Sequence, residues 1–314
     1  MDKFRLAIII VNYKTPEMIY DALHSLESEL DHSIDRVVIV DNFSGDGSVE
    51  KISQYINGNN WSGWVILESS PVNGGFSAGN NIGVKLVNAE FYLLLNSDAW
   101  VRPNALHLML QSMERNSHAG LVGPRLEWGN TEQQVSCFNN MTPWTELLHL
   151  ANTGPLTRIL GILGIHEIAV PTSDNSDSPE WISFACVLIR KEVFGDIGLL
   201  DEDFFMYMED IDFCRRARLA GWDVLFEKKA RAVHSNKGLS QNKKIKRLPK
   251  FYYESRSRYF IKYYGRIGLL VANILWYLGR TISSTRELFQ GRERRVPLGS
   301  YKDIWYGFWA KIEE

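Results

Sequence analysis

Acidic residues directly follow short apolar runs at two points of the sequence. Asp98 closes the run LLLNSD, and Asp41 follows VVIV. Mg²⁺ and Mn²⁺ prefer carboxylate oxygens and bridge them to phosphate oxygens, so Asp98 could hold a divalent ion beside a diphosphate. Asp41 could accept the imide N–H of a uracil or thymine base. The plainer alternative in both cases is a cap or turn, and DNFSGDGS around Asp41 has ample turn residues.

A second acidic group, Glu209, Asp210 and Asp212, follows the apolar segment FFMYM. Acids favour a helix N-terminus through the helix dipole, which is one explanation of this cluster. The apolar approach predicts instead a partly buried carboxylate, whose raised pKa would suit a general base near neutral pH. His234 lies in a polar stretch after another apolar run, either as a structural or exposed histidine or as a second metal ligand beside Asp98.

Neutral polar residues accompany these acids. Asn12 and Tyr13 follow the first apolar run, and the Tyr13 ring could stack on a base. The segment NGGFSAGNNIG (73–83) is glycine-rich, and Gly75 would allow a ligand to approach the backbone closely. It does not match GxGxxG and follows the third run, so a dinucleotide fold is not indicated. Its Asn73 and Asn80 could donate to a substrate or close the loop.

Four short apolar runs alternate with amphipathic segments in the first half of the chain. This order predicts a parallel sheet with helices on both faces, and hence an α/β fold. Ligands of such sheets bind at the carboxyl ends of the strands, where the polar residues described above would gather. The runs are 6–11, 37–40, 64–67 and 91–95, and the helical segments are 16–30, 46–56, 77–88 and 103–116.

Composition limits the class of protein. The chain has 314 residues, 45% of them hydrophobic and 23% charged, which is typical of a soluble globular protein. Its three cysteines form no CxxC pair, so neither a zinc site nor a disulfide framework is predicted. The longest apolar stretch, 267–278, is too short to cross a bilayer.

Charge is distributed unevenly. Residues 1–227 hold 15 Lys and Arg against 31 Asp and Glu, whereas residues 228–314 hold 20 against 6. The basic part calls for an anionic partner, and a diphosphate-bearing substrate, anionic lipid and nucleic acid are all candidates. No nucleic-acid-binding motif accompanies it, so nucleic acid is not expected.

An ordered series of motifs carries a family resemblance. Over about residues 5–260 the chain resembles family 2 glycosyltransferases, in particular their bacterial rhamnosyltransferase-like branch. The resemblance implies a GT-A fold, with a catalytic domain over 1–248 and a helical, basic extension over 249–314. The motifs are VNYKT (11–15), VDNFSGDGS (40–48), NGGFSAGNNIG (73–83), LLLNSDAWV (93–101), FACVLIRKEVF (184–194), LDEDFFMYMEDIDFCRRARLAG (200–221) and VHSNKGLS (233–240).

The resemblance also implies roles for single residues. Asp98 matches the metal-binding acid of the family's DxD-type motif, although Asn96 replaces the first acid, and His234 matches the histidine that completes the Mg²⁺ or Mn²⁺ site. Asp210 matches the catalytic base, with Glu209 beside it. The residues expected to bind the nucleotide sugar are Asn12, Tyr13, Asp41, Asn73, Gly75, Asn80, Asn96, Ser97 and Asp98.

The implied reaction is an inverting transfer of L-rhamnose from dTDP-L-rhamnose to a glycan or polyprenyl-diphosphate-linked acceptor, as in O-antigen synthesis. UDP-galactofuranose, UDP-hexose and GDP-sugar donors are alternatives, as is a nucleotide-sugar-binding module without turnover. A nucleotidyltransferase is disfavoured because VNYKTPE is not a glycine-rich, basic loop.

A cytoplasmic protein is expected, peripheral on the inner face of the plasma membrane if its basic part binds lipid. Anionic headgroups or the carrier diphosphate could contact Lys243, Lys244, Lys246 and Arg247, although a solvated loop explains these residues equally well. The aromatic helices after residue 249 could dock on a membrane or form a homodimer.

Overall fold

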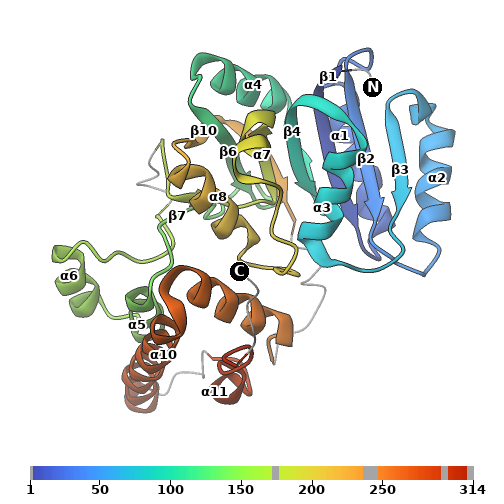
Figure 1. The fold of residues 1–314 in the computed structure, drawn as a ribbon. Coiled ribbons are helices and arrows are strands. Elements are labelled where there is room, and N and C mark those ends of the chain that lie inside the picture. Colours follow the sequence, from blue (N-terminus) through green and yellow to red (C-terminus); the bar gives the residue numbers. More distant parts are fainter. Residues whose placement is uncertain (1–2, 172–176, 236–246, 291–295, 310–314) are drawn as a thin grey trace.

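A mixed sheet of eight strands forms the centre of the molecule. The computed structural model describes residues 3–171, 177–235, 247–290 and 296–309 (Figure 1). Across the sheet the strands run β3 (Val65–Ser69), β2 (Asp35–Asp41), β1 (Lys3–Asn12), β4 (Asn88–Asn96), β9 (Cys186–Arg190), β6 (Ala119–Glu127), β10 (Asp223–His234) and β5 (Ala99–Val101).

The predicted parallel sheet is confirmed for the first four strands, and the register explains how their ends come together. Asn12 at the end of β1 pairs with Asp41 at the end of β2, while Val11 pairs with Asn96 at the end of β4. The second half of the sheet departs from the parallel pattern because β9 and β5 run antiparallel to their neighbours. The architecture is the GT-A type expected from the motifs, a mostly parallel sheet flanked by helices and followed by a helical C-terminal part.

Both faces of the sheet are covered, because successive side chains of a strand point to opposite faces and both sets are apolar. Leu6, Ile8 and Ile10 of β1 belong to one core cluster, whereas Ala7 and Ile9 belong to the other. The first face is covered by α1 (Pro16–Glu27), α2 (Ser48–Gly58) and α4 (Ala105–Arg115). The second is covered by α3 (Gly75–Leu86), α7 (Lys191–Ile197), α8 (Glu209–Leu219) and part of α10 (Lys250–Gln290).

The close approach of α3 to β1 depends on two glycines one helical turn apart. A Cβ at Gly79 would lie 2.8 Å from Val11, and one at Gly83 would lie 2.4 Å from Ile9. Both glycines face the strand because residues four apart share a helix face. The motif NGGFSAGNNIG therefore positions the helix against β1 as well as forming a loop.

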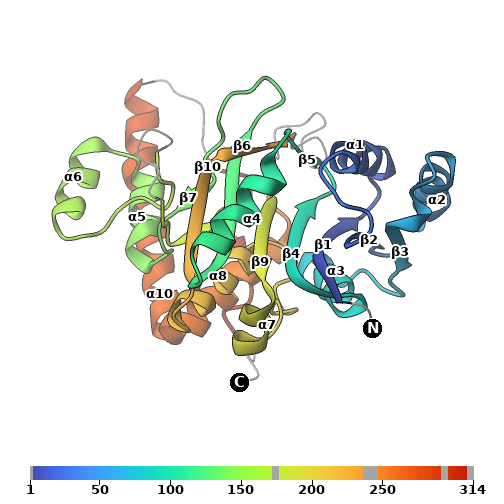
Figure 2. The ribbon, with the colours of Figure 1, turned by 90° about the horizontal axis from the view of Figure 1, so that it is seen from above.

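The C-terminal helix α10 is two helices joined at Gly265, where the backbone leaves the helical region with φ 67° and ψ 178°. Tyr259, Phe260 and Leu269 of α10 pack into the core cluster that includes α8. The helix also packs on α5 (Pro143–Ala151), at the end of the molecule opposite β3 and α2 (Figures 1 and 2). The division at residue 248 that the motifs suggest stays a prediction.

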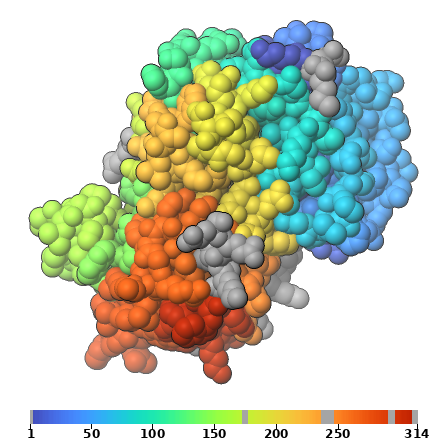
Figure 3. Space-filling model, in the orientation of Figure 1, coloured from blue at the N-terminus to red at the C-terminus, as the bar shows by residue number. Residues whose placement is uncertain are grey.

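The remaining elements are small. The 3-10 turn η1 (Trp61–Gly63) lies against α2 and β3, whereas the pair β7 (Cys137–Phe138) and β8 (Trp181–Ile182), α6 (Gly154–Ile162) and α11 (Ser300–Asp303) belong to the other side of the molecule. In the space-filling view α10 and α11 fill the lower part of the face, coloured orange to red (Figure 3). Among the described residues, no helix combines the length and apolarity needed to cross a membrane.

Candidate active site

A cleft of about 470 Å³ lies at the carboxyl ends of β1 and β4, beside the start of α8. It brings together nine of the twelve residues that the sequence predicts for the site. These are Tyr13, Asn73, Gly75, Asn96, Ser97, Asp98, Glu209, Asp210 and His234. The convergence follows from topology, since parallel strands end at one edge of the sheet.

Asp98 and His234 meet because β10 pairs with β5, which places His234 opposite Ala99. The Asp98 Oδ1 and His234 Nε2 atoms are 3.3 Å apart, and the side-chain amide nitrogen of Asn96 is 3.4 Å from the same Nε2. Two ligands at right angles on an octahedral ion of this kind lie about 3 Å apart, so the pair fits a shared Mg²⁺ or Mn²⁺. A rotated Asn96 amide would present its oxygen instead.

Few side chains at this point of the cleft could act as metal ligands. Across the described ranges no group of three or more His, Cys, Asp or Glu side chains could enclose a metal ion. This agrees with Asn96 standing in place of an acid. A cation here would need further oxygen ligands from a phosphate or from water, which is how Mg²⁺ is usually bound beside nucleotides.

Asp210 and Glu209 open α8 after a sharp turn, in which Tyr207 and Met208 have φ values of 70° and 71°. Burial raises the pKa of Asp210 to about 6, although the backbone N–H of Ile211 donates to its Oδ1 at 2.9 Å and opposes the shift. Burial, and then the charge of Asp210, raises the pKa of Glu209 well above its ordinary value. With a pKa of about 6, Asp210 is mostly ionised at neutral pH, whereas burial and the charge of Asp210 both favour the protonated form of Glu209.

The third acid of the cluster, Asp212, stabilises the fold. It is fully buried and receives hydrogen bonds from Arg216 at 2.8 Å and from the Tyr263 hydroxyl at 2.8 Å. The Lys262 ammonium lies 2.6 Å from Asp212 Oδ1, the oxygen that also accepts from Tyr263. Asp212 thus ties α8 to α10 and does not line the cleft.

Three predicted ligand-binding residues, Asn12, Asp41 and Asn80, lie in the interior and not on the cleft surface. The Asp41 carboxylate accepts hydrogen bonds from Asn12 Nδ2 at 2.7 Å and from the Ser44 hydroxyl and backbone N–H at 2.6 and 3.0 Å. Asn80 lies within α3 and donates to the Phe76 carbonyl at 2.9 Å. These side chains order the loops behind the cleft, and their part in ligand binding stays a prediction.

Other cleft residues were not predicted. Asn42 joins two loops by donating to Asn73 Oδ1 at 3.0 Å and to the Gly75 carbonyl at 2.9 Å. The position of Asn42 directly after Asp41, in the motif VDN, could have indicated that it belongs to the site. Phe251 of α10 also lines the cleft, and nothing local in the sequence indicates that a residue so distant along the chain returns there.

The basic segment is only partly described. Lys243, Lys244 and Lys246 lie outside the described residues. Arg247 donates to both carboxylate oxygens of Asp303, at 2.7 and 2.6 Å, so its charge is neutralised within the C-terminal part. The Arg247 side chain is nevertheless 57% exposed, so its contact with an anionic surface stays a prediction.

The comparison with known families gives the class of the N-terminal part. The family described as glycosyl transferase family 2 matches residues 7–154. Residues 7–154 therefore match a family 2 glycosyltransferase domain. The match contains the loops after β1, β2 and β4, and so the half of the cleft that includes Asp98.

Curated relatives of the chain act in glycan synthesis. It is 28% identical over 218 residues to the low-salt glycan biosynthesis hexosyltransferase Agl10 of Haloferax volcanii, covering 68% of this chain and 61% of that protein. It is 24% identical over 258 residues to the N-acetylglucosaminyl-diphospho-decaprenol L-rhamnosyltransferase of Mycobacterium tuberculosis, covering 73% and 75%. The first of these matches thus spans less than two thirds of the relative's length.

Solved structures show the same fold. The mannosyltransferase PcManGT of Pyrobaculum calidifontis, in complex with GDP-Man and Mn²⁺, has a TM-score of 0.58 at 11% identity, covering 92% of this chain and 76% of that one. Residues 1–349 of S. aureus TarS have a TM-score of 0.53 at 16% identity, covering 97% and 79%.

Proposed function

We propose that the protein is an inverting, metal-dependent glycosyltransferase that moves L-rhamnose from dTDP-L-rhamnose to a glycan or lipid-linked acceptor in polysaccharide synthesis. The observation that carries the proposal is the single cleft that Asp98, His234 and Asp210 line together. The L-rhamnosyltransferase relative supports the donor sugar, and its name supports a lipid-linked acceptor.

Asp98 and His234, with Asn96 beside them, would hold Mg²⁺ or Mn²⁺. The ion, when bound, supplies positive charge that stabilises the departing diphosphate. Tyr13, which is 45% exposed at the cleft, offers its ring to the nucleotide base. Only glycine fits at position 75, because a Cβ there would lie 2.0 Å from the Phe205 carbonyl oxygen, and this close packing holds the 73–75 loop at the edge of the cleft.

Asp210 takes the proton of the acceptor hydroxyl. The acceptor oxygen forms its bond to the anomeric carbon while the bond from that carbon to the diphosphate oxygen breaks on the opposite side, which inverts the configuration. The diphosphate leaves with the electron pair of the broken bond. A base with a pKa of about 6 is ionised at neutral pH, yet it is more basic than an ordinary aspartate.

A nucleotide-sugar-binding module without turnover is the alternative function. Binding alone does not require a buried carboxylate that titrates near neutrality, so Asp210 favours catalysis. Within the enzyme class, UDP-galactofuranose, UDP-hexoses and GDP-sugars remain the competing donors.

Thermal unfolding with nucleotides, with and without Mn²⁺, tests the proposal. We expect dTDP to raise the Tm in the presence of Mn²⁺, and UDP and GDP to raise it less. Stronger stabilisation by UDP or GDP would reassign the donor. No metal-dependent nucleotide effect would overturn the proposed function.

Peripheral membrane contact is the last part of the proposal. On the second half of α10 an apolar stripe is exposed at helical spacing, formed by Ile267, Leu270, Val271, Ile274 and Leu278. The basic excess of residues 228–314 supports an anionic lipid surface as the occupant. A homodimer through the same stripe is the competing result, and sedimentation with and without anionic vesicles distinguishes the two.

A further inference from the structure

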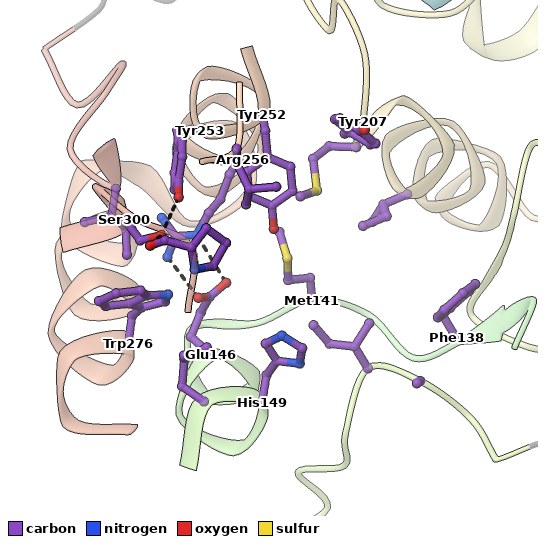
Figure 4. A pocket seen from close by; sticks show the side chains of 18 of the residues that line it. Phe138, Met141, Glu146, His149, Tyr207, Tyr252, Tyr253, Arg256, Trp276 and Ser300 are labelled. Carbon is purple, nitrogen blue, oxygen red and sulfur yellow. Dashed lines mark hydrogen bonds and ion pairs between the residues drawn. The ribbon is translucent and has the colours of Figure 1, made fainter. Parts of the chain in front are cut away.

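A second cavity, of about 620 Å³, adjoins the cleft. Tyr207, Glu209 and Asp210 line both. The remaining walls come from α5, β8, α10 and residues 296–304 (Figure 4). A molecule in this cavity therefore reaches Asp210 without entering the space that the nucleotide sugar would fill.

The cavity offers no spare positive charge. Arg256 is the one Lys or Arg among its described lining residues, and it is 97% buried, at 3% exposure. Its Nε donates to Glu146 Oε1 at 3.3 Å (Figure 4), and its Nη1 donates to Asn273 Oδ1 at 2.9 Å. Glu146 balances the guanidinium charge, so a phosphate or diphosphate placed here would lose its hydration without gaining a counter-charge.

Two buried polar atoms of the lining residues have no hydrogen-bond partner among the described residues. They are Arg256 Nη2 and Glu209 Oε2. Arg256 Nη2 lies 3.2 Å from Glu146 Oε2, which is a close charge contact without hydrogen-bond geometry. A hydrocarbon chain would leave both atoms unpaired, which is costly, whereas hydroxyl groups can accept from one and donate to the other.

Aromatic side chains form much of the remaining wall. Phe138 and Trp181 stack with ring centroids 3.9 Å apart and planes 12° apart, and Tyr207, Tyr252 and Trp276 also line the cavity (Figure 4). Sugar rings present C–H faces that pack on aromatic rings, while their hydroxyl edges reach polar groups. A few polar groups within an apolar wall is the usual make-up of a small-molecule site, and the volume lies in the usual range of about 300–1,000 Å³.

We infer that this cavity binds uncharged sugar units of the acceptor and presents the hydroxyl to be glycosylated to Asp210. Any lipid or diphosphate of the acceptor lies outside the cavity. The inference rests on the proposed function and adds the chemical class of the acceptor portion that the enzyme recognises.

Ala169 allows a test with little risk to the fold. It lines the cavity but is exposed, so Ala169→Phe fills the space without entering the core. Ala220→Phe is the matched control, because Ala220 is equally exposed and lines neither cavity. Glu146→Gln tests hydroxyl recognition separately by leaving the Arg256 charge unbalanced.

Binding is measured by saturation-transfer NMR in the presence of dTDP and Mn²⁺. The probes are methyl glycosides of glucose, galactose, mannose, rhamnose and N-acetylglucosamine, with farnesol and farnesyl diphosphate as the apolar and anionic probes. We expect at least one methyl glycoside to bind the wild type and Ala220→Phe, and its signal to fall at least fivefold in Ala169→Phe. In Glu146→Gln, affinity for that glycoside should fall while nucleotide stabilisation persists.

Two results would overturn the inference. One is the binding of no glycoside, and the other is the displacement of farnesol or farnesyl diphosphate, but not of glycosides, by Ala169→Phe. If dTDP with Mn²⁺ still raises the Tm, only the acceptor assignment fails. If that stabilisation is absent as well, the proposed function itself fails.

Discussion

Replacing Asp210 by Asn should slow transfer by orders of magnitude and, unusually for a change at a half-buried site, stabilise the protein at neutral pH. Asparagine cannot accept the acceptor proton, so the rate should fall by roughly 10²–10⁴, the usual contribution of a general base. Donor binding should persist, because the metal pair Asp98 and His234 is untouched.

The gain in stability follows from the raised pKa. Burial raises the pKa of Asp210 from the ordinary 3.8 to about 6 in the folded chain, so the folded state holds the proton more tightly than the unfolded chain. The free-energy cost of burying the ionised Asp210 carboxylate is absent below the pKa of the unfolded chain, near 3.8. This cost grows as the pH rises and reaches its full value above about pH 6. The shift corresponds to about 3 kcal/mol, and the surface that Asp210 keeps in the cleft reduces this to about 1–3 kcal/mol.

Thermal unfolding and pH–rate profiles measure both effects. An entropy of unfolding of about 2.1 cal/mol/K per residue converts the gain into a Tm increase of about 2–4 °C at pH 7.5. The Tm difference between Asp210→Asn and the wild type should become smaller as the pH falls towards 5. The wild-type rate should fall below an apparent pKa near 6, and the residual rate of Asp210→Asn should not show this step.

Asp21→Asn is the matched control, because Asp21 is exposed on α1 and does not line the cleft. It should change neither the rate nor the pH dependence of the Tm. The reasoning would be refuted by Asp210→Asn activity within tenfold of the wild type, or by a wild-type rate that is flat between pH 5 and 7.5.

Three further predictions concern other parts of the molecule. Asp98→Ala and His234→Ala should each abolish the Mn²⁺-dependent Tm increase with dTDP, and an unchanged increase in either would remove that residue from the metal site. Gly83→Ala should destabilise the protein by about 1–3 kcal/mol, measured by urea unfolding, because its Cβ would lie 2.4 Å from Ile9. Ile274→Glu should reduce co-sedimentation with anionic vesicles. If the variant instead sediments more slowly than the wild type when no vesicles are present, the apolar stripe forms a dimer interface.

The sequence predicted the site best where the chemistry follows from strand ends. Apolar runs ending in polar residues placed Asp98 and Tyr13 at one edge of a parallel sheet, and the motif series added Asp210 and His234. The structure gathers these four residues in one cleft. The prediction succeeded because register in a buried parallel sheet is fixed by its hydrophobic pattern, so the strands must end together.

The sequence failed where side-chain direction or distant packing decides the outcome. Asp41 has the correct place after its strand, but its carboxylate turns inward to Asn12 and Ser44, and no spacing rule predicts that choice. The antiparallel β9 lies between β4 and β6 because of long-range pairing that its local pattern does not contain. The return of Phe251 to the cleft is non-local in the same way.

The C-terminal helix α10 holds the segment that carries Asp210, the proposed base. Three acids open α8, and the helix dipole alone would accommodate all of them. Asp212 is nevertheless bound by Lys262 and Tyr263 of α10, and Ser255 of α10 donates to the Met206 carbonyl at 3.0 Å, just before the turn that leads to Asp210.

These contacts hold the chain before and after Asp210, at Met206 and at Asp212. A shift of α10 would therefore move Asp210 relative to Asp98. The rhamnosyltransferase-like motifs end near residue 260, within α10, and the matched family domain ends at residue 154. The geometry between metal and base therefore depends on contacts beyond that matched domain. If α10 also contacts membrane or acceptor, as proposed, such contacts would act on the same helix that positions the base.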